Sequence, residues 1–232
     1  MYPAIQIGGV SLSTYYLMML VGFLAMGYLM LHRKDYYGLS TSKACLFTVL
    51  LMLSGLLGCK LLYVLENLRD VAQKGLTLGG FSFFGAVFGI PLLMGMCGHL
   101  FGLSVKQTLD ASAPCVAAMV GTIRFGCFLN GCCGGWNMKI GTISFHWPTQ
   151  ALESIGDFII LFWLLALEEK KKRSGELYLL FMLSYGAIRF WIEFLRDTPK
   201  DWLFFSHGQW FSAAAVFISI AAMRSLKREK RT

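Results

Sequence analysis

Seven long apolar stretches, separated by short charged or glycine-rich breaks, dominate this chain of 232 residues. A stretch of about 18 or more apolar residues with few charges is long enough to cross a membrane as a helix. Charged residues make up 15% of the chain and hydrophobic residues 56%, whereas a soluble domain averages about 25% charged residues. The pattern excludes an ordinary soluble domain. It predicts an all-α, polytopic membrane bundle with about seven transmembrane helices.

The apolar stretches also predict where the helices lie. Because further spans follow the first one, we interpret it as a retained helix and not as a cleaved signal peptide. The sequence shows no internal repeat and no low-complexity linker, so we expect a single integral membrane domain over residues 1–232. The spans are predicted at residues 12–31, 44–65, 81–101, 111–129, 151–167 (a short one), 177–195 and 202–223.

Basic residues are distributed unequally between the two sets of loops. One set, together with the C-terminal tail, carries 13 lysines and arginines, and the opposite set carries 5. Cytoplasmic loops are the ones enriched in lysine and arginine. We therefore expect the N-terminus outside and the C-terminus in the cytoplasm. The net charge of +8 follows from this asymmetry and indicates no nucleic-acid partner.

Several charged residues fall near the predicted outer ends of the spans. They include Lys60, Arg124, Glu153, Glu193 and Arg196. A charge at the centre of a bilayer costs at least about 2.5–3.5 kcal/mol, so such residues face the bundle interior, form pairs or lie in a wet cavity. Two interpretations are open. The charges could form an ion-pair network that holds helices together, or an anion site for a lipid phosphate, for which the planar fork of arginine is suited.

The stretch "RFGCFLNGCCGG", residues 124–135, combines one of these arginines with glycines and three cysteines. Glycine allows backbone to approach a ligand closely. Cys127, Cys132 and Cys133 allow four interpretations: a disulfide, a metal site, a reactive thiolate beside Arg124, or thiols that only pack. The spacing fits no standard zinc pattern, with His146 and His207 as the available fourth ligands. We therefore predict no metal.

Seven motifs in order resemble the prolipoprotein diacylglyceryl transferase family over nearly the whole chain. Each is modest alone, but their order and the spans between them are specific. The motifs are "GGVSLSTYYLMMLVGF" (8–23), "GCKLLYVL" (58–65), "GGFSFFGAVFG" (79–89), "TIRFGCFLNGCCGG" (122–135), "WPTQALES" (147–154), "YGAIRFWIEFLRD" (185–197) and "SHGQ" (206–209).

The resemblance implies a reaction and a set of site residues. The family moves the diacylglyceryl group of phosphatidylglycerol onto the cysteine thiol of a prolipoprotein, and glycerol phosphate leaves. It requires no metal or other cofactor. The residues implied as catalytic are Arg124, Asn130, Glu193 and Arg196. Those implied as substrate-binding are Lys60, Tyr16, Gly126, Gly131, Gln150, Glu153, Tyr185, Arg189 and Gln209, with a possible thiol role for Cys127, Cys132 and Cys133.

The chain also departs from the family pattern. Phe84 stands where the third-span motif has a histidine, and Cys127 and Cys132 replace an asparagine and a glutamate of the signature. Trp147 replaces a second histidine, and the outer segment before it is shortened to residues 136–145. The resemblance therefore implies a retained phosphate-binding frame, with altered acid–base groups and an altered acceptor platform.

Two classes of function follow. The first is a phosphatidylglycerol-dependent transferase that acts on a prolipoprotein signal peptide or on a closely related thiol acceptor. The second is a non-enzymatic membrane relative that keeps the phospholipid site as a lipid-binding or scaffolding protein. For either class, the resemblance implies a multi-pass protein of the bacterial plasma (inner) membrane, with its site toward the outer face. We expect a monomer that binds no nucleic acid.

Overall fold

The computed structural model describes residues 4–7, 10–75, 80–140, 143–170, 174–200 and 203–228. Seven helices in these ranges are long and apolar enough to cross a membrane, which confirms the predicted polytopic helical class. They are α1 (Thr14–His32), α2 (Thr41–Glu66), α4 (Phe84–Phe101), α5 (Val105–Asn130), α6 (Thr149–Glu168), α7 (Glu176–Ile192) and α8 (His207–Arg228). The span of α7 continues through the 3-10 helix η2 (Glu193–Leu195). Two shorter helices, α3 (Leu68–Lys74) and η1 (Asp35–Tyr37), complete the set.

Three helices differ from the sequence prediction. Helix α5 begins at Val105, six residues before the predicted start of its span. Helix α6 has 20 residues, so the fifth span is of ordinary length. Helix α8 begins only at His207, because Leu203 and Phe204 both adopt a positive φ and cannot continue a helix. The Ser206 hydroxyl accepts a hydrogen bond from the Gln209 amide, and the Gln209 side chain accepts one from the Ser206 amide. The polar stretch "SHGQ" is thus a capping box that starts α8.

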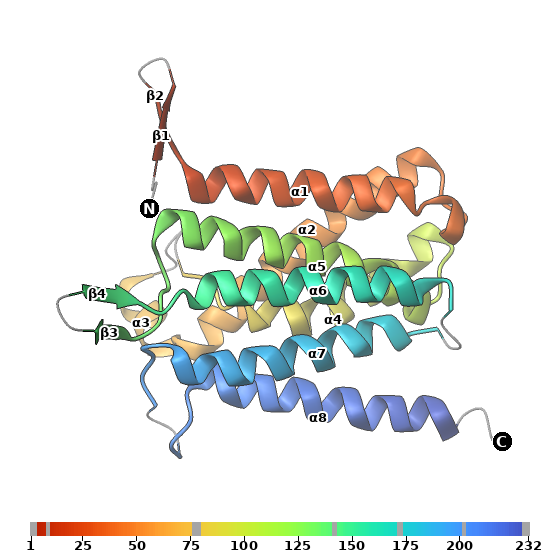
Figure 1. Ribbon diagram of the computed structural model, residues 1–232. Helices are drawn as coiled ribbons and strands as arrows, with labels where there is room; N and C mark the ends of the chain where they lie inside the picture. The colour runs from red at the N-terminus through yellow and green to blue at the C-terminus, as the bar shows by residue number, and fades with distance from the viewer. Residues whose placement is uncertain are drawn as a thin grey trace. The chain divides into compact units, whose positions relative to one another are not determined.

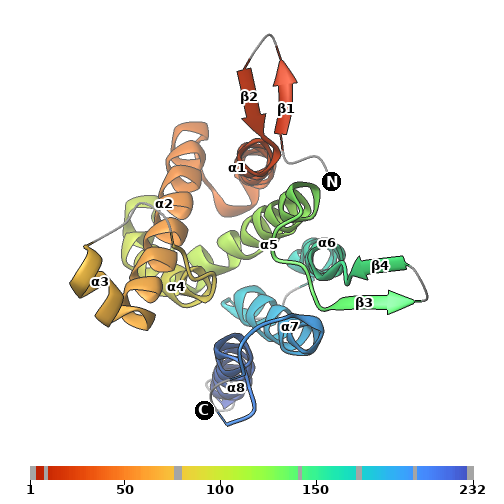
Figure 2. The ribbon, with the colours of Figure 1, turned by 90° about the vertical axis from the view of Figure 1, so that its left-hand side faces the viewer.

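The chain divides into two compact units, and the first comprises Met1–Leu29 and Ala113–Thr232. Within it, α7 packs against α6 on one side and α8 on the other, as Figures 1 and 2 show. The end of α5, the start of α6, the end of α7 and the start of α8 all lie at one end of this unit (Figure 1, left). A Cβ on Gly126 would lie 2.8 Å from the Cβ of Met18, so α5 needs glycine there to pack against α1.

Two β-hairpins, which the sequence analysis did not anticipate, extend from the same end of the first unit (Figure 1). Strand β1 (Ala4–Ile7) pairs antiparallel with β2 (Val10–Ser13), in the register Ala4 with Ser13. Strand β3 (Asn137–Ile140) pairs antiparallel with β4 (Ile143–His146), in the register Asn137 with His146. The hairpins are short additions, with four residues in each strand, to a bundle that is all-α as predicted.

The second unit, Met30–Ser112, is built on the pair α2 and α4. Gly58 of α2 and Gly85 of α4 place their backbones in direct contact, and a Cβ on Gly89 would lie 2.8 Å from the Cα of Gly58. Small residues let membrane helices approach closely. This contact gives Gly58 and Gly85 a role in helix packing. Arg33, 6% exposed, donates to the backbone carbonyl of Ala111.

Candidate active site

A buried ion-pair network joins three helices at the hairpin end of the first unit. Glu153, on the first turns of α6, is 2% exposed. Its Oε2 lies 2.6 Å from Nε of Arg124, which is on the last turns of α5. Its Oε1 accepts a hydrogen bond from Nη1 of Arg189 on α7. One carboxylate therefore binds a guanidinium from each neighbouring helix, one through each oxygen.

Helix α7 and the 3-10 helix after it continue the network. Glu193, 2% exposed, lies one turn beyond Arg189, and its Oε2 is 2.7 Å from Nη2 of that arginine. Arg196 lies 3.5 Å from Glu153 through Nη1 and 3.6 Å from Glu193 through Nε. Its Nε has no hydrogen-bond partner among the described residues. Among the ion pairs between described residues of this network, those of Arg196 are thus the longest.

Glu193 is held by the segment that leads into α8. Its Oε1 accepts hydrogen bonds from the hydroxyls of Thr198, at 2.8 Å, and Ser206, at 3.0 Å. Gly208 lies against the same carboxylate, and a Cβ there would come within 3.2 Å of it. The capping box of α8 therefore also positions Glu193. Gln209, fully buried, belongs to that box, and its Nε2 has no partner in the described part of the chain.

The loop after α5 is fastened to α6 and to the segment after α7. Gln150 Nε2 donates to the Cys132 carbonyl at 2.5 Å, and the Thr149 hydroxyl donates to the Cys133 carbonyl at 3.2 Å. Gly135 pairs with Arg196 as an isolated β-bridge. Trp136 Nε1 donates to the Arg196 carbonyl at 2.6 Å. The backbone of Arg196 is therefore fixed, although its side chain is loosely paired.

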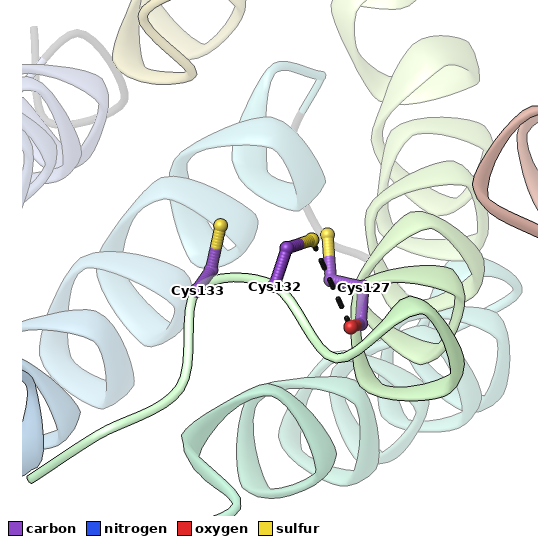
Figure 3. Close-up of side chains that lie close together, drawn as sticks. All are labelled: Cys127, Cys132 and Cys133. Carbon is purple, nitrogen blue, oxygen red and sulfur yellow. Dashed lines mark hydrogen bonds between the residues drawn. The ribbon is translucent and has the colours of Figure 1, made fainter. Parts of the chain in front are cut away.

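Three thiols lie together beside this loop (Figure 3). The sulfur atoms of Cys127, Cys132 and Cys133 are all within 4.8 Å of one another, and all three residues are free thiols in the structure. Cys133 lies in the loop and is exposed, whereas Cys127 on α5 is buried. A hydrogen bond with the Cys127 thiol, and then the positive charges of Arg196 and Arg124, hold the pKa of Cys133 well below its usual range.

The structure brings most of the residues implied by the resemblance to this end of the first unit. Tyr185 lies one turn before Arg189 on α7, 2% exposed, with its ring stacked on Phe181. Asn130 is the last residue of α5. The members that join the network or support it directly are Arg124, Gln150, Glu153, Arg189, Glu193, Arg196 and Gln209.

Four of the implied residues have other surroundings. Tyr16 is 67% exposed on α1 and packs edge-on against Tyr15. Gly126 is explained by its close packing on α1, and Gly131, with φ of +77°, by ending α5 in a left-handed conformation. Lys60 belongs to the second unit, where its ammonium lies 3.4 Å from the Gly80 carbonyl and 5.2 Å from the Tyr63 ring centroid.

The sequence assigned no role to three residues that support the network. Thr198, Ser206 and Trp136 position Glu193 or Arg196, yet no apolar periodicity marks them. The Ser-x-x-Gln spacing of residues 206–209 was the one available signal, since it is a capping box. Asp157, one turn after Glu153 on α6, is 1% exposed, and its Oδ2 has no hydrogen-bond partner within the described ranges.

Comparison with known proteins gives a consistent result. The family model described as prolipoprotein diacylglyceryl transferase matches residues 3–224. A phosphatidylglycerol–prolipoprotein diacylglyceryl transferase of Clostridium tetani is 29% identical, with 93% of each chain covered. Enzymes of that name from Clostridium perfringens and Methylobacillus flagellatus are each 31% identical. The first comparison covers 84% of this chain and 83% of the relative, and the second covers 95% and 96%. With its seven apolar helices, this chain belongs to the prolipoprotein diacylglyceryl transferase family, a family of bacterial membrane transferases.

Proposed function

We propose that this protein transfers the diacylglyceryl group of phosphatidylglycerol to the cysteine thiol of a prolipoprotein or a closely related acceptor. The acceptor thiolate forms a carbon–sulfur bond at the glycerol carbon that carries the phosphate. The carbon–oxygen bond to that phosphate breaks, and its electron pair leaves with the oxygen as glycerol phosphate. The names of the relatives and the arginine network support the proposal.

The observation that carries the proposal is the unequal pairing of the arginines. Arg124 and Arg189 are bound to Glu153 by short contacts, whereas both ion pairs of Arg196 are long. A guanidinium can bind two phosphate oxygens at once. Arg196 is therefore the side chain that can turn to the lipid phosphate at the least cost in existing contacts. Its fixed backbone keeps it at the site.

The other network residues then have positioning or electrostatic roles. Arg124 and Arg189 contribute a fixed positive field, which stabilises charge that develops on the departing phosphate. Glu153 and Glu193 hold the arginines in place. Asn130 and the Gly131 backbone, at the end of α5, are proposed to contact the glycerol, and the same field lowers the pKa of an incoming thiol.

One assay tests this function. Purified protein is incubated with phosphatidylglycerol labelled in its head group, with and without a peptide that contains a lipobox cysteine. Release of labelled glycerol phosphate that requires the peptide, together with a diacylglyceryl thioether on the peptide, is the expected result. Absence of both products in a protein that binds the lipid would refute the transferase.

A non-enzymatic lipid-binding role is the second candidate, because of Phe84. This residue starts α4, is 5% exposed and stacks on Phe88. A phenyl ring cannot exchange a proton as the family histidine could. This candidate predicts phosphatidylglycerol binding with no glycerol phosphate release under either condition, so the same assay separates the two.

We also propose the orientation and location that the loops and the family suggest. The 13-to-5 distribution of basic residues supports an outer N-terminus and a cytoplasmic C-terminus in the bacterial inner membrane. The network then lies toward the outer face, where secreted prolipoproteins would arrive. A single membrane domain and a monomeric state complete the proposal.

A further inference from the structure

We propose that Cys127, Cys132 and Cys133 form a three-coordinate binding site for a soft metal ion, with Cu(I) as the preferred ion. The spacing of the cysteines in the sequence predicted no metal, because it fits no standard zinc pattern. The structure shows three sulfur atoms already gathered within 4.8 Å of one another (Figure 3). Three sulfurs each about 2.3 Å from one ion lie about 4 Å apart in a trigonal plane. Small side-chain rotations are enough to close the site.

The backbone holds these thiols in place without a metal. Gly131, with φ of +77°, reverses the chain at the end of α5, so that Cys132 returns over the last turn, which carries Cys127. Cys133 has φ of +62°, a left-handed conformation that is uncommon for a residue with a side chain. Strained residues of this kind persist where the surroundings hold them and occur at ligand sites.

Helix α6 supplies those surroundings. The Gln150 side chain donates to the Cys132 carbonyl and the Thr149 hydroxyl to the Cys133 carbonyl. Both hydrogen bonds hold the backbone of the two cysteines in place, as hydrogen bonds from neighbouring residues do for metal ligands. Cys133 is exposed and Cys132 half-buried, so an ion can enter from the loop side.

The ligand set favours Cu(I) over zinc. Thiolates are soft ligands and select Cu(I), zinc or iron–sulfur clusters, but structural zinc is almost always bound by four ligands. Within the described ranges, the group that could hold an ion contains the three cysteines alone. His146, the last residue of β4, is not part of that group, and its Nδ1 lies 3.4 Å from the Gly135 carbonyl. Three-coordinate thiolate geometry therefore fits the monovalent copper ion.

The neighbouring arginines offset the charge of the loaded site. Each thiol that becomes a ligand loses its proton to solvent, and no oxidation or reduction takes place. Three thiolates and one Cu(I) carry a charge of −2, and the positive charges of Arg196 and Arg124 act on this loop. The two arginines can therefore offset the negative charge that remains when the bound ion carries only one positive charge.

The test is a Cu(I) titration of the reduced, detergent-purified full chain under anaerobic conditions, with bicinchoninate as the competing chelator. We expect the protein to remove one equivalent of Cu(I) from the chelator and to develop a thiolate-to-copper charge-transfer absorption. X-ray absorption should report three sulfur neighbours. Bound Cu(I) should also raise the unfolding temperature, since a ligand that binds the folded state stabilises it.

Matched serine variants decide the outcome. Cys127→Ser, Cys132→Ser and Cys133→Ser should each weaken Cu(I) binding more than about 100-fold, because even outer-shell substitutions weaken metal binding 10–100-fold. Cys45→Ser and Cys97→Ser change thiols outside the cluster, so they should leave the affinity for Cu(I) unchanged. Equal Cu(I) uptake by the parent and the triple serine variant would overturn the proposal. So would a copper centre with fewer than three sulfur neighbours. Intact-mass measurement after reduction confirms that no disulfide competes.

Discussion

Arg124 and Glu153 come from different helices and form a buried ion pair with 2.6 Å between Nε and Oε2. The second oxygen of the same carboxylate binds Arg189, so Glu153 joins α5, α6 and α7 at one point. The sequence had left a structural network and a phosphate site as alternatives. The structure shows the network. Arg196 has long ion pairs within it, so this residue can belong to the network and also bind a phosphate.

Replacing Glu153 should destabilise the protein. In Glu153→Gln, three arginines lose a shared carboxylate, and breaking a buried ion pair costs about 3–5 kcal/mol. We expect a clearly lower unfolding temperature in detergent, measured by a thermal scan. The control is Glu169→Gln, an exposed carboxylate just after α6, which should unfold like the parent. Identical unfolding of both variants would mean that the network does not hold the helices.

Arg196 and Arg124 should differ in how their loss affects the protein. A charge-assisted hydrogen bond contributes about 1.5–3 kcal/mol, so Arg196→Ala and Arg124→Ala should each weaken phosphatidylglycerol binding about tenfold or more. Only Arg124→Ala should also lower the unfolding temperature, because only it leaves a short contact to Glu153 unpaired. Lipid affinity and thermal unfolding are measured on the same samples.

The control for that comparison is Lys139→Ala, which removes an exposed cation from β3. It should change neither lipid affinity nor unfolding temperature. If Lys139→Ala weakens lipid binding as much as Arg196→Ala does, general attraction to the anionic lipid explains the effect. Arg196 would then not bind the lipid phosphate specifically.

Trp136 should act through Arg196. Its indole nitrogen donates to the Arg196 carbonyl at 2.6 Å, and Trp136→Phe removes that bond while keeping an aromatic ring for the Lys200 ammonium, 5.0 Å from the ring centroid. We expect a higher KM for phosphatidylglycerol and little change in unfolding temperature. Trp163→Phe, on the exposed side of α6, is the matched control. An unchanged KM in Trp136→Phe would show that this bond does not position Arg196.

Gly126 should prove to be a packing residue. Gly126→Ala would place a Cβ 2.8 Å from Met18 Cβ, and such overpacking costs about 1–3 kcal/mol. Gly134→Ala, whose Cβ would find its nearest neighbours at 3.6 Å, should be close to neutral. Both are compared by thermal unfolding. A Gly126→Ala protein of parental stability that fails to bind phosphatidylglycerol would instead restore the substrate-binding role.

The membrane orientation can be tested by thiol labelling in intact cells. In a background with serine at the three clustered cysteines, Lys139→Cys should react with a membrane-impermeant reagent and Lys170→Cys should not. Both positions are exposed in the structure, and both substitutions replace a lysine, so each controls for the other. The opposite labelling pattern would invert the proposed orientation.

Hydropathy over about 20 residues is a local property, so the sequence predicted the membrane class and the seven spans, five of them closely. Helix α5 begins at Val105, six residues before the predicted start. The sequence also selected Arg124, Glu153, Arg189, Glu193 and Arg196, since a charge in an apolar segment requires a reason. The start of α8 was placed too early, because two left-handed residues and a capping box, not hydropathy, set it. The hairpins were missed because their strands are only four residues long.

Which charges pair and which thiols meet depends on how the helices pack. Hydropathy places Glu153 near the end of a helix, but the partner of each oxygen depends on how α5, α6 and α7 pack. The sulfurs of Cys127 and Cys133 are close because two left-handed residues turn the loop back over α5. The ion pairs depend on distances between segments that are remote in sequence, and the thiol contacts depend on individual backbone angles. A local pattern of hydropathy encodes neither the distances nor the angles.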